Sequence, residues 1–304
     1  MNLLIANHYA KGKHKRFPEW LFAPRAHNSQ EACRIQAFLK DHSIHTVCER
    51  ANCPNRRDCY SRRSMTFLIL GDRCTRQCAF CSVSKEAPGP VNPEEPAKIA
   101  YLVACLNISY IIITSVTRDD LSDGGAAHFA RCIQVVREKN GDLPIEVLVP
   151  DFAGSLQALC LVVESNPAVI GHNIETVRRR YSLMRRGADY QRSLLLLKEV
   201  KRIHPGLITK SGIMVGLGET AEEVIETLND LRAASVDIVT IGQYLRSHHD
   251  AADVSEFVPP EQFGYYRQKA EKIGFSVVNA GPFIRSSYMA KEAYLVATAK
   301  KTIG

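Results

Sequence analysis

The chain has 304 residues, of which 45% are hydrophobic and 23% are charged, as is typical of a globular protein. This composition excludes collagen-like, mucin-like and wholly disordered chains, and no apolar run approaches the roughly 18 residues of a membrane span. The formal net charge of +7 is compatible with an acidic protein, nucleotide or nucleic-acid partner. Because residues 1–10 lack the charged start and apolar stretch of a secretory signal, we expect a cytoplasmic protein.

Residues 1–61 show no clear hydrophobic periodicity, and we interpret them as an N-terminal extension folded around something else. From residue 62 onward, short β-rich apolar runs alternate with helical patterns, which is typical of βαβ units in a parallel sheet. The expected strands are 66–70, 110–114, 145–149, 168–174, 207–215 and 236–241. The expected helices are 96–107, 126–139, 155–165, 191–204, 221–234 and 260–273. The tail adds one more apolar strand, 275–279.

Local signals support several of these boundaries. Gly124-Gly125 precedes the second helix and Asn140-Gly141 follows it, at a position where glycine is favoured. Thr220 and Glu223 have the spacing of a capping box. Six units suit a partial barrel or an open sheet, and periodicity alone does not decide between them. In either case ligands bind at the C-terminal ends of the strands.

Ten cysteines in a chain without an export signal indicate metal ligands rather than disulfides. Six of them form two triplets between residues 48 and 81. Cys33 and Cys132 are dispersed, while Cys105 and Cys160 lie in apolar helical runs, where we interpret them as small buried hydrophobic residues. We predict that all four are passive.

The second triplet, Cys74, Cys78 and Cys81, directly follows the first expected strand with the spacing C-x3-C-x2-C. Three soft ligands in one loop suit an iron–sulfur cluster, whereas a structural zinc site normally has four ligands. A [4Fe–4S] cluster with three cysteine ligands leaves one iron open to chelate S-adenosylmethionine, whose reductive cleavage yields a 5′-deoxyadenosyl radical. The spacing resembles the radical S-adenosylmethionine signature, and Phe80 is placed where an aromatic ring can pack on the adenine.

The first triplet, Cys48, Cys53 and Cys59, has the spacing C-x4-C-x5-C. By itself it fits zinc or a redox disulfide as well as a cluster. Beside the other triplet it indicates a second iron–sulfur cluster that is one ligand short. The tail offers Arg285-Ser286-Ser287-Tyr288 as a place to find that ligand.

Together, the two triplets and this tail closely resemble the lipoyl synthase family, and the resemblance covers nearly the whole chain. The pairing of a C-x4-C-x5-C triplet with an Arg-Ser-Ser-Tyr tail separates this family from other radical enzymes. The segments that carry the resemblance are 18–21, 46–48, 53–55, 70–76, 114–121, 172–176, 187–190, 210–220, 242–245 and 285–288.

The resemblance implies an α/β fold, a partial (β/α)6 TIM-type barrel over residues 62–274 with extensions at 1–61 and 275–304. It implies one [4Fe–4S] cluster on Cys74, Cys78 and Cys81, and an auxiliary [4Fe–4S] cluster on Cys48, Cys53, Cys59 and Ser287. Without it, Ser287 is an ordinary turn serine.

Asn173 and Glu175 are expected to contact S-adenosylmethionine. The backbone of the 216–219 loop is expected to approach its adenine. A helix-start cap with a first-turn acid explains Asn173 and Glu175 nearly as well. Beyond the cluster ligands, no catalytic side chain is expected.

The implied activity is that of a sulfurtransferase, which inserts two sulfur atoms at C6 and C8 of an octanoyl chain attached to a lysine of a lipoyl carrier domain. Acid, base or nucleophile cannot activate such carbons, so the cofactor must supply a radical. The implied partners are octanoylated carrier domains (2-oxoacid dehydrogenase E2 subunits and the glycine cleavage H protein), a ferredoxin- or flavodoxin-type electron donor and an iron–sulfur carrier protein. Neither nucleic acid nor membrane is implied, and we expect a monomer.

Two other functions fit parts of the sequence. An RNA-modifying methylthiotransferase would suit the positive charge, but it has a longer N-terminal domain and a terminal RNA-binding module. A zinc-bound nucleic-acid module is supported by the charge alone, since aromatic residues make up 8% and no recognition motif occurs. The chain departs from the usual family pattern, without losing a ligand, at Arg56, Arg57, Arg63, Ser64, Arg186, Met289 and within 247–255.

Overall fold

The computed structural model describes residues 18–22 and 29–303, so the N-terminal segment tested for a secretory signal lies outside it. Within these residues, seven parallel strands form one sheet in chain order. Because neighbours in the chain are neighbours in the sheet, the strands wind in one direction as in a barrel, whereas a doubly wound sheet reverses its order. The strands are β1 (Thr66–Ile69), β2 (Ile111–Ser115), β3 (Ile145–Leu148), β4 (Val169–Gly171), β5 (Ile208–Val215), β6 (Ile238–Gln243) and β7 (Val277–Gly281).

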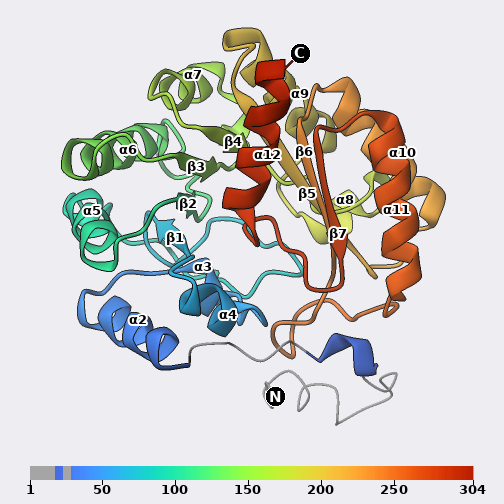
Figure 1. Cartoon of the computed structure of the whole chain (residues 1–304), viewed down its shortest axis with the longest axis horizontal. Coiled ribbons are helices and arrows are strands. Elements are labelled where there is room, and N and C mark those ends of the chain that lie inside the picture. Colours follow the sequence, from blue (N-terminus) through green and yellow to red (C-terminus); the bar gives the residue numbers. More distant parts are fainter. Residues whose placement is uncertain (1–17, 23–28, 304) are drawn as a thin grey trace.

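Helices surround the strands on the outside (Figure 1), and the apolar side chains between the two layers form one large buried cluster. The predicted partial barrel is therefore confirmed. The long outer helices are α5 (Glu95–Leu106), α6 (Ala126–Asn140), α7 (Leu156–Glu164), α9 (Tyr190–Ile203), α10 (Ala221–Ala233) and α11 (Pro260–Ile273). Shorter turns are η2 (Phe152–Gly154), η3 (Arg178–Arg180) and α8 (Tyr181–Met184). No described helix is long and apolar enough to cross a membrane.

The predicted helix boundaries hold to within one or two residues. Gly125 precedes α6 in a left-handed conformation, Gly141 ends it, and Thr220 and Glu223 form both bonds of a capping box. The expected strand 168–174 is too long, because the chain leaves the sheet after Gly171. The tail strand, in contrast, is β7, which pairs with β6 and extends the same sheet.

The N-terminal extension contains regular structure that its hydrophobic pattern did not predict: η1 (Glu19–Leu21), α2 (Ser29–Asp41), α3 (Val47–Arg50) and α4 (Arg56–Ser61). Thr46 pairs in the antiparallel sense with Phe67, so the extension covers the free edge of β1. The Thr46 hydroxyl also lies 2.8 Å from the buried Tyr60 hydroxyl, which joins the start of α3 to α4. The extension is thereby fixed beside the first strand of the barrel.

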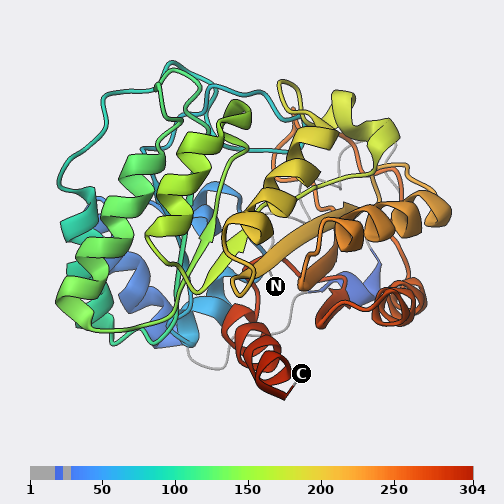
Figure 2. The same ribbon diagram turned by 90° about the horizontal axis from the view of Figure 1, so that it is seen from above.

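The last helix, α12 (Ala290–Ile303), was not predicted either, and it closes one end of the barrel. Ala293 and Ala297 of α12 pack against Val169, Ile208 and Ile238 inside the sheet. Its lysines bond to residues that lie one or two positions before β2, β5 and β7, namely Lys291 to Ser109, Lys301 to Gly206 and Lys300 to Ser276. The helix therefore covers the N-terminal strand ends, on the side away from the loop that follows β1 (Figures 1 and 2).

A buried ion pair crosses the barrel interior above α12. Lys210 of β5 lies 2.8 Å from Glu146 of β3, and both side chains are at most 2% exposed. The Tyr110 hydroxyl donates to the second carboxylate oxygen of Glu146 at 2.7 Å. Since Tyr110 also packs against Tyr294 of α12, the network links the barrel interior to its closing helix.

The four dispersed cysteines are only partly as predicted. Cys132 is buried, but Cys105 is exposed and Cys160 is half-buried, so their interpretation as buried hydrophobic residues is wrong. In α5, the buried face consists of residues such as Leu102, Val103 and Leu106, and Cys105 lies on the opposite face. Because both helices are apolar on most sides, their sequences do not indicate whether each cysteine lies on the buried or the exposed face.

Candidate functional site

The second cysteine triplet lies in a loop that begins with a sharp turn after β1. Leu70 and Gly71 have φ angles of +66° and +88°, which turn the chain out of the strand. The Cys74 amide donates to the Ser84 carbonyl at 2.8 Å, and the Cys74 sulfur accepts a bond from the Thr117 amide at 3.3 Å. The loop is therefore fixed against the end of β2 as well as against itself.

Arg76, between two cysteines of this loop, ties it to two further strands. Its guanidinium bonds to Asp119 at 2.8 and 2.9 Å and to Asp151 at 2.6 Å, after β2 and β3 respectively. Asp151 also pairs with Arg192 of α9 at 2.7 Å. Burial raises the pKa of Asp151, but Arg76 and Arg192 outweigh it and hold that pKa well below the usual range. Sequence reasoning missed this network, although Asp119 stands in a strand-end loop where charged residues gather.

The three thiols of this loop lie close enough for their charges to interact. Burial, together with the neighbouring thiols of the triplet, raises the pKa of Cys78 and raises that of Cys81 to about 12. Iron binds cysteine as the thiolate, so it would displace the thiol protons on binding. Glu175 and Arg185 are close enough to Cys78 to act on its charge in opposite directions.

Asn173 and Glu175 follow β4 and lie beside this loop. Glu175 has a φ of +67°, and its amide and carbonyl bond to Gly212 and Met214 of β5, each at 2.9 Å. The next helical turn, η3, is preceded by Val177 without a side-chain cap, so the alternative interpretation of a helix cap is wrong. Burial raises the pKa of Glu175, and Arg185 opposes that effect.

Among the buried polar atoms without a hydrogen-bond partner are Ser115 Oγ at the end of β2, Thr176 Oγ1 next to Glu175, and Arg185 Nε. The same guanidinium donates to the Asn173 carbonyl at 2.7 Å. Leaving a buried donor unsatisfied costs about 1–3 kcal/mol, so the site fits a ligand with acceptor groups. The amino-acid portion of S-adenosylmethionine has such groups.

The 216–219 loop and Phe80, each of which the sequence predicts near an adenine, lie next to each other. Gly216 and Gly218 have φ angles of +96° and +91°, and the Glu219 carboxylate accepts bonds from the amides of Gly216 and Leu217. Phe80 packs with Leu217 and Tyr244 in a small apolar cluster. The backbone of this glycine-containing loop and an aromatic side chain therefore share one corner of the strand-end face.

The first triplet is assembled at the corner between α3 and α4. Cys48 lies in α3, Cys59 in α4, and Cys53 in the turn between them. Burial and then the charge of Cys53 raise the pKa of Cys48 to about 12. Burial, followed by Cys48 and Cys53, also raises that of Cys59. The structure thus brings these three thiols together as well.

The Arg-Ser-Ser-Tyr tail lies against this corner. Asn55 Nδ2 donates to the Phe283 carbonyl at 2.6 Å, and the Tyr288 hydroxyl donates to Asp58 at 3.2 Å. Arg285 is shielded from solvent, which lowers its pKa, while the charge of Cys53 acts to raise it. Ser287, which is half-buried, stands between these contacts in the chain.

Soft thiolates beside a cationic guanidinium fit an iron–sulfur cluster. Within residues 18–22 and 29–303, no three His, Cys, Asp or Glu side chains converge on a position that could hold one metal ion. This finding concerns a single metal ion, whereas a four-iron cluster keeps its ligands further apart.

Gly242 of β6 allows the tail to reach its position. A Cβ atom there would lie 2.0 Å from the Ile284 carbonyl oxygen and 3.3 Å from the Arg285 guanidinium. Any side chain at residue 242 must therefore displace the tail from the strand.

We expect Gly242→Ala to lower the iron and sulfide bound per chain to about half, because the displaced tail no longer completes the corner at the first triplet. The atoms nearest to a Cβ at residue 242 belong to the tail, so the loop of the second triplet should keep its iron. Iron and sulfide analysis after anaerobic reconstitution measures this effect. Gly264→Ala is the matched control, since no atom lies within 4 Å of a Cβ at that position. Unchanged iron content in Gly242→Ala would contradict the role of the tail.

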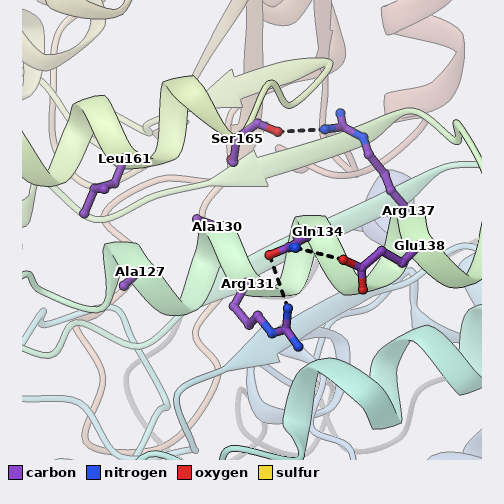
Figure 3. Close-up of a pocket in the computed structure, with 8 residues that line it drawn as sticks. All are labelled: Ala127, Ala130, Arg131, Gln134, Arg137, Glu138, Leu161 and Ser165. Atoms are coloured by element: carbon purple, nitrogen blue, oxygen red, sulfur yellow. Dashed lines mark hydrogen bonds between the residues drawn. The ribbon is translucent and has the colours of Figure 1, made fainter.

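A hollow of about 640 Å³ lies elsewhere, on the outer surface between α6 and α7 (Figure 3). Its polar side chains bond to each other or to nearby backbone: Gln134 bridges Arg131 and Glu138, and Arg137 donates to the Ser165 carbonyl. None of the cysteines lines this hollow. The strand-end face, where both triplets lie, remains the candidate site.

Known proteins resemble this chain in sequence over most of its length. The family model described as Radical SAM superfamily matches residues 68–231. A lipoyl synthase of Caldanaerobacter subterraneus is 52% identical over 275 residues, which span 90% of this chain and 96% of that protein. The lipoyl synthase of Caldicellulosiruptor bescii is 50% identical over 90% of this chain and 94% of that protein. The lipoyl synthase of Burkholderia mallei is 47% identical over 90% of this chain and 83% of that protein.

Solved structures resemble the fold at much lower sequence identity. Streptococcus suis SuiB bound to S-adenosylmethionine superposes with a TM-score of 0.56 at 12% identity, over 83% of this chain and 54% of that one. HydG, a maturase of the [FeFe]-hydrogenase, superposes with a TM-score of 0.53 at 13% identity, over 89% and 75%. At this identity the likeness concerns the barrel and its flanking elements.

Proposed function

The chain belongs to the lipoyl synthase family of the radical S-adenosylmethionine superfamily, and we propose that its two cysteine triplets divide the reaction of that family between them. Its reaction is sulfur insertion, which makes it a sulfurtransferase, and its cofactors are [4Fe–4S] clusters and S-adenosylmethionine. When bound, these cofactors supply the radical that removes hydrogen from the octanoyl chain and the sulfide that replaces it.

Cys74, Cys78 and Cys81 hold the cluster that binds S-adenosylmethionine. Asn173 and Glu175 orient the amino-acid portion of this molecule, with the unpartnered Nε of Arg185 close by. The backbone of the 216–219 loop and Phe80 receive the adenine. The protein contributes position and the exclusion of water and oxygen, because acids and bases cannot activate the target carbons.

Cys48, Cys53, Cys59 and Ser287 hold the auxiliary cluster. The observation that carries this assignment is the seating of the tail, which bonds to Asn55 and Asp58 on either side of Ser287. A serine oxygen is a harder ligand than a thiolate and matches cluster iron less well. This weaker bond suits a cluster that must give up sulfide during turnover.

The substrate is an octanoylated lipoyl carrier domain, either a 2-oxoacid dehydrogenase E2 subunit or the glycine cleavage H protein. A ferredoxin- or flavodoxin-type protein supplies electrons, and an iron–sulfur carrier protein rebuilds the auxiliary cluster. The +7 charge of the chain suits acidic carrier domains. The protein works as a cytoplasmic monomer without nucleic acid or membrane, and its three parts are the extension 1–61, the barrel 62–274 and the extension 275–304.

This function is tested by incubating the reconstituted protein anaerobically with S-adenosylmethionine, a strong reductant and an octanoylated carrier peptide. Mass spectrometry should show the gain of two sulfur atoms at the octanoyl chain. A peptide that gains a methylthio group, or no sulfur at all, would contradict the proposal. Bound zinc, or iron and sulfide sufficient for only one cluster, would contradict the two-cluster assignment.

Ser287→Ala is expected to retain S-adenosylmethionine cleavage while sulfur insertion falls by at least about tenfold, because only the auxiliary site loses a ligand. Chromatography of 5′-deoxyadenosine and mass spectrometry of the carrier peptide measure the two activities in one reaction. Full lipoyl yield in this variant would refute Ser287 as a ligand. Ser276→Ala, a serine replacement just before β7, serves as the control.

A further inference from the structure

The hydroxyl of Ser286, in the tail, bonds to Asn173, a residue of the proposed S-adenosylmethionine site. Ser286 Oγ donates to Asn173 Oδ1 at 2.9 Å. Asn173 Nδ2 in turn donates to Glu175 Oε1 at 3.0 Å. Because the carboxylate needs a donor, the amide nitrogen must face Glu175, and its oxygen is left to accept from Ser286. The tail is therefore bonded to a residue of the other site.

We call the hydrogen-bonded series Ser286–Asn173–Glu175 the Asn173 relay. Its Glu175 end is fixed to the sheet. The backbone of Glu175 bonds to Gly212 and Met214 of β5, and Arg185 donates to the Asn173 carbonyl at 2.7 Å. A Cβ atom at Gly212 would lie 3.0 Å from Asn173 Oδ1, so the glycine leaves the space in which the amide oxygen meets Ser286. Asn173 thus stands in one defined position between the strands and the tail.

The Ser286 end of the relay is next to Ser287, the proposed ligand of the auxiliary cluster. Ser287 follows Ser286 directly, and neighbouring Cα atoms are only about 3.8 Å apart, so neither residue can move far without the other. Tyr288 fixes the other side of Ser287 through its bond to Asp58. The position of Ser287 is therefore set by one contact to each site.

We propose that Asn173 is a positioning residue that couples the two sites, with the Ser286 hydroxyl as the connecting group. This inference rests on the proposed function, because it assigns S-adenosylmethionine to Asn173 and Glu175 and the auxiliary cluster to Ser287. A bound S-adenosylmethionine holds the Asn173 amide in place, and the amide then holds Ser286 and Ser287. Coupling of binding free energies is reciprocal, so a seated tail strengthens the binding of S-adenosylmethionine by the same factor.

Hydrogen–deuterium exchange of residues 283–289 in the reconstituted protein, with and without S-adenosylmethionine, tests the coupling. In the unaltered chain, S-adenosylmethionine should slow exchange in this segment. In Ser286→Ala this effect should disappear, and the dissociation constant for S-adenosylmethionine should rise about 2- to 10-fold, the value of one hydrogen bond. Ser286→Thr keeps the hydroxyl and should restore both properties.

Tyr288→Phe is the matched control, since it removes the bond to Asp58 and leaves the Asn173 relay intact. It should speed exchange of the segment but keep the slowing caused by S-adenosylmethionine. The coupling is overturned if Ser286→Ala, with both clusters loaded, binds S-adenosylmethionine as tightly as the unaltered chain and shows the same slowing. An unaltered chain that bound two clusters but no S-adenosylmethionine would contradict the proposed function itself, and the coupling with it.

Discussion

Replacing Cys78 with alanine is expected to abolish both S-adenosylmethionine cleavage and sulfur insertion, whereas replacing Cys59 abolishes sulfur insertion alone. Each substitution removes one ligand from one triplet. Loss of even an outer partner of a metal ligand costs about 10- to 100-fold, so we expect the affected activity to fall by more than about 100-fold. Measuring 5′-deoxyadenosine and sulfur insertion in the same reactions separates the two activities.

Cys132→Ala is the control for this pair, because Cys132 is buried in α6 and belongs to neither triplet. It should retain both activities and the full iron content. Iron and sulfide should fall to about half in each of the other two variants, since the remaining triplet still holds its cluster. Loss of S-adenosylmethionine cleavage in Cys59→Ala would contradict the division of labour.

Replacing Lys210 with methionine is expected to lower the free energy of unfolding by about 3–5 kcal/mol, the usual cost of removing one partner from a buried ion pair. Glu146 would be left with Tyr110 as its donor, in a position where both side chains of the pair are at most 2% exposed. Anaerobic urea unfolding followed by circular dichroism measures the loss.

Two further variants separate the buried charge from simple packing. Adding Glu146→Gln to Lys210→Met removes the unpaired charge and should recover part of the stability. Lys201→Met breaks another ion pair, but Asp237 keeps Lys301 at 3.3 Å and the Thr209 amide at 2.8 Å, so its loss should be smaller. If Lys210→Met and Lys201→Met lowered the free energy of unfolding equally, the interior ion pair would contribute no more to stability than the Lys201–Asp237 pair.

Most of the barrel could be predicted because its signals are local. Each strand is a short apolar run and each outer helix has one apolar face, so a window of ten residues contains the information. The capping box at Thr220 and the glycines around α6 were readable for the same reason. The end of β4 was not, because Glu175 adopts its left-handed φ to reach backbone groups of β5, a contact between distant segments.

In the candidate site, too, the features with local signals could be predicted and those that depend on distant segments could not. The spacing of each cysteine triplet predicted which thiols lie together, since a loop of a few residues cannot separate them. Arg76 gave no such signal, because its partners Asp119 and Asp151 come from other strand ends. Cys105 was misplaced because an apolar helix does not reveal in its sequence which face meets the barrel.

The sequence by itself determined the two triplets, the alternation of strands and helices and the family, all of which depend on residue type and spacing along the chain. Only the tertiary structure decided how the parts meet. It placed α12 over the N-terminal strand ends, the extension on the edge of β1, and Ser286 against Asn173. These contacts join residues far apart in the chain, and they form because the curvature of the open sheet brings the ends of β4 and β6 and the tail together.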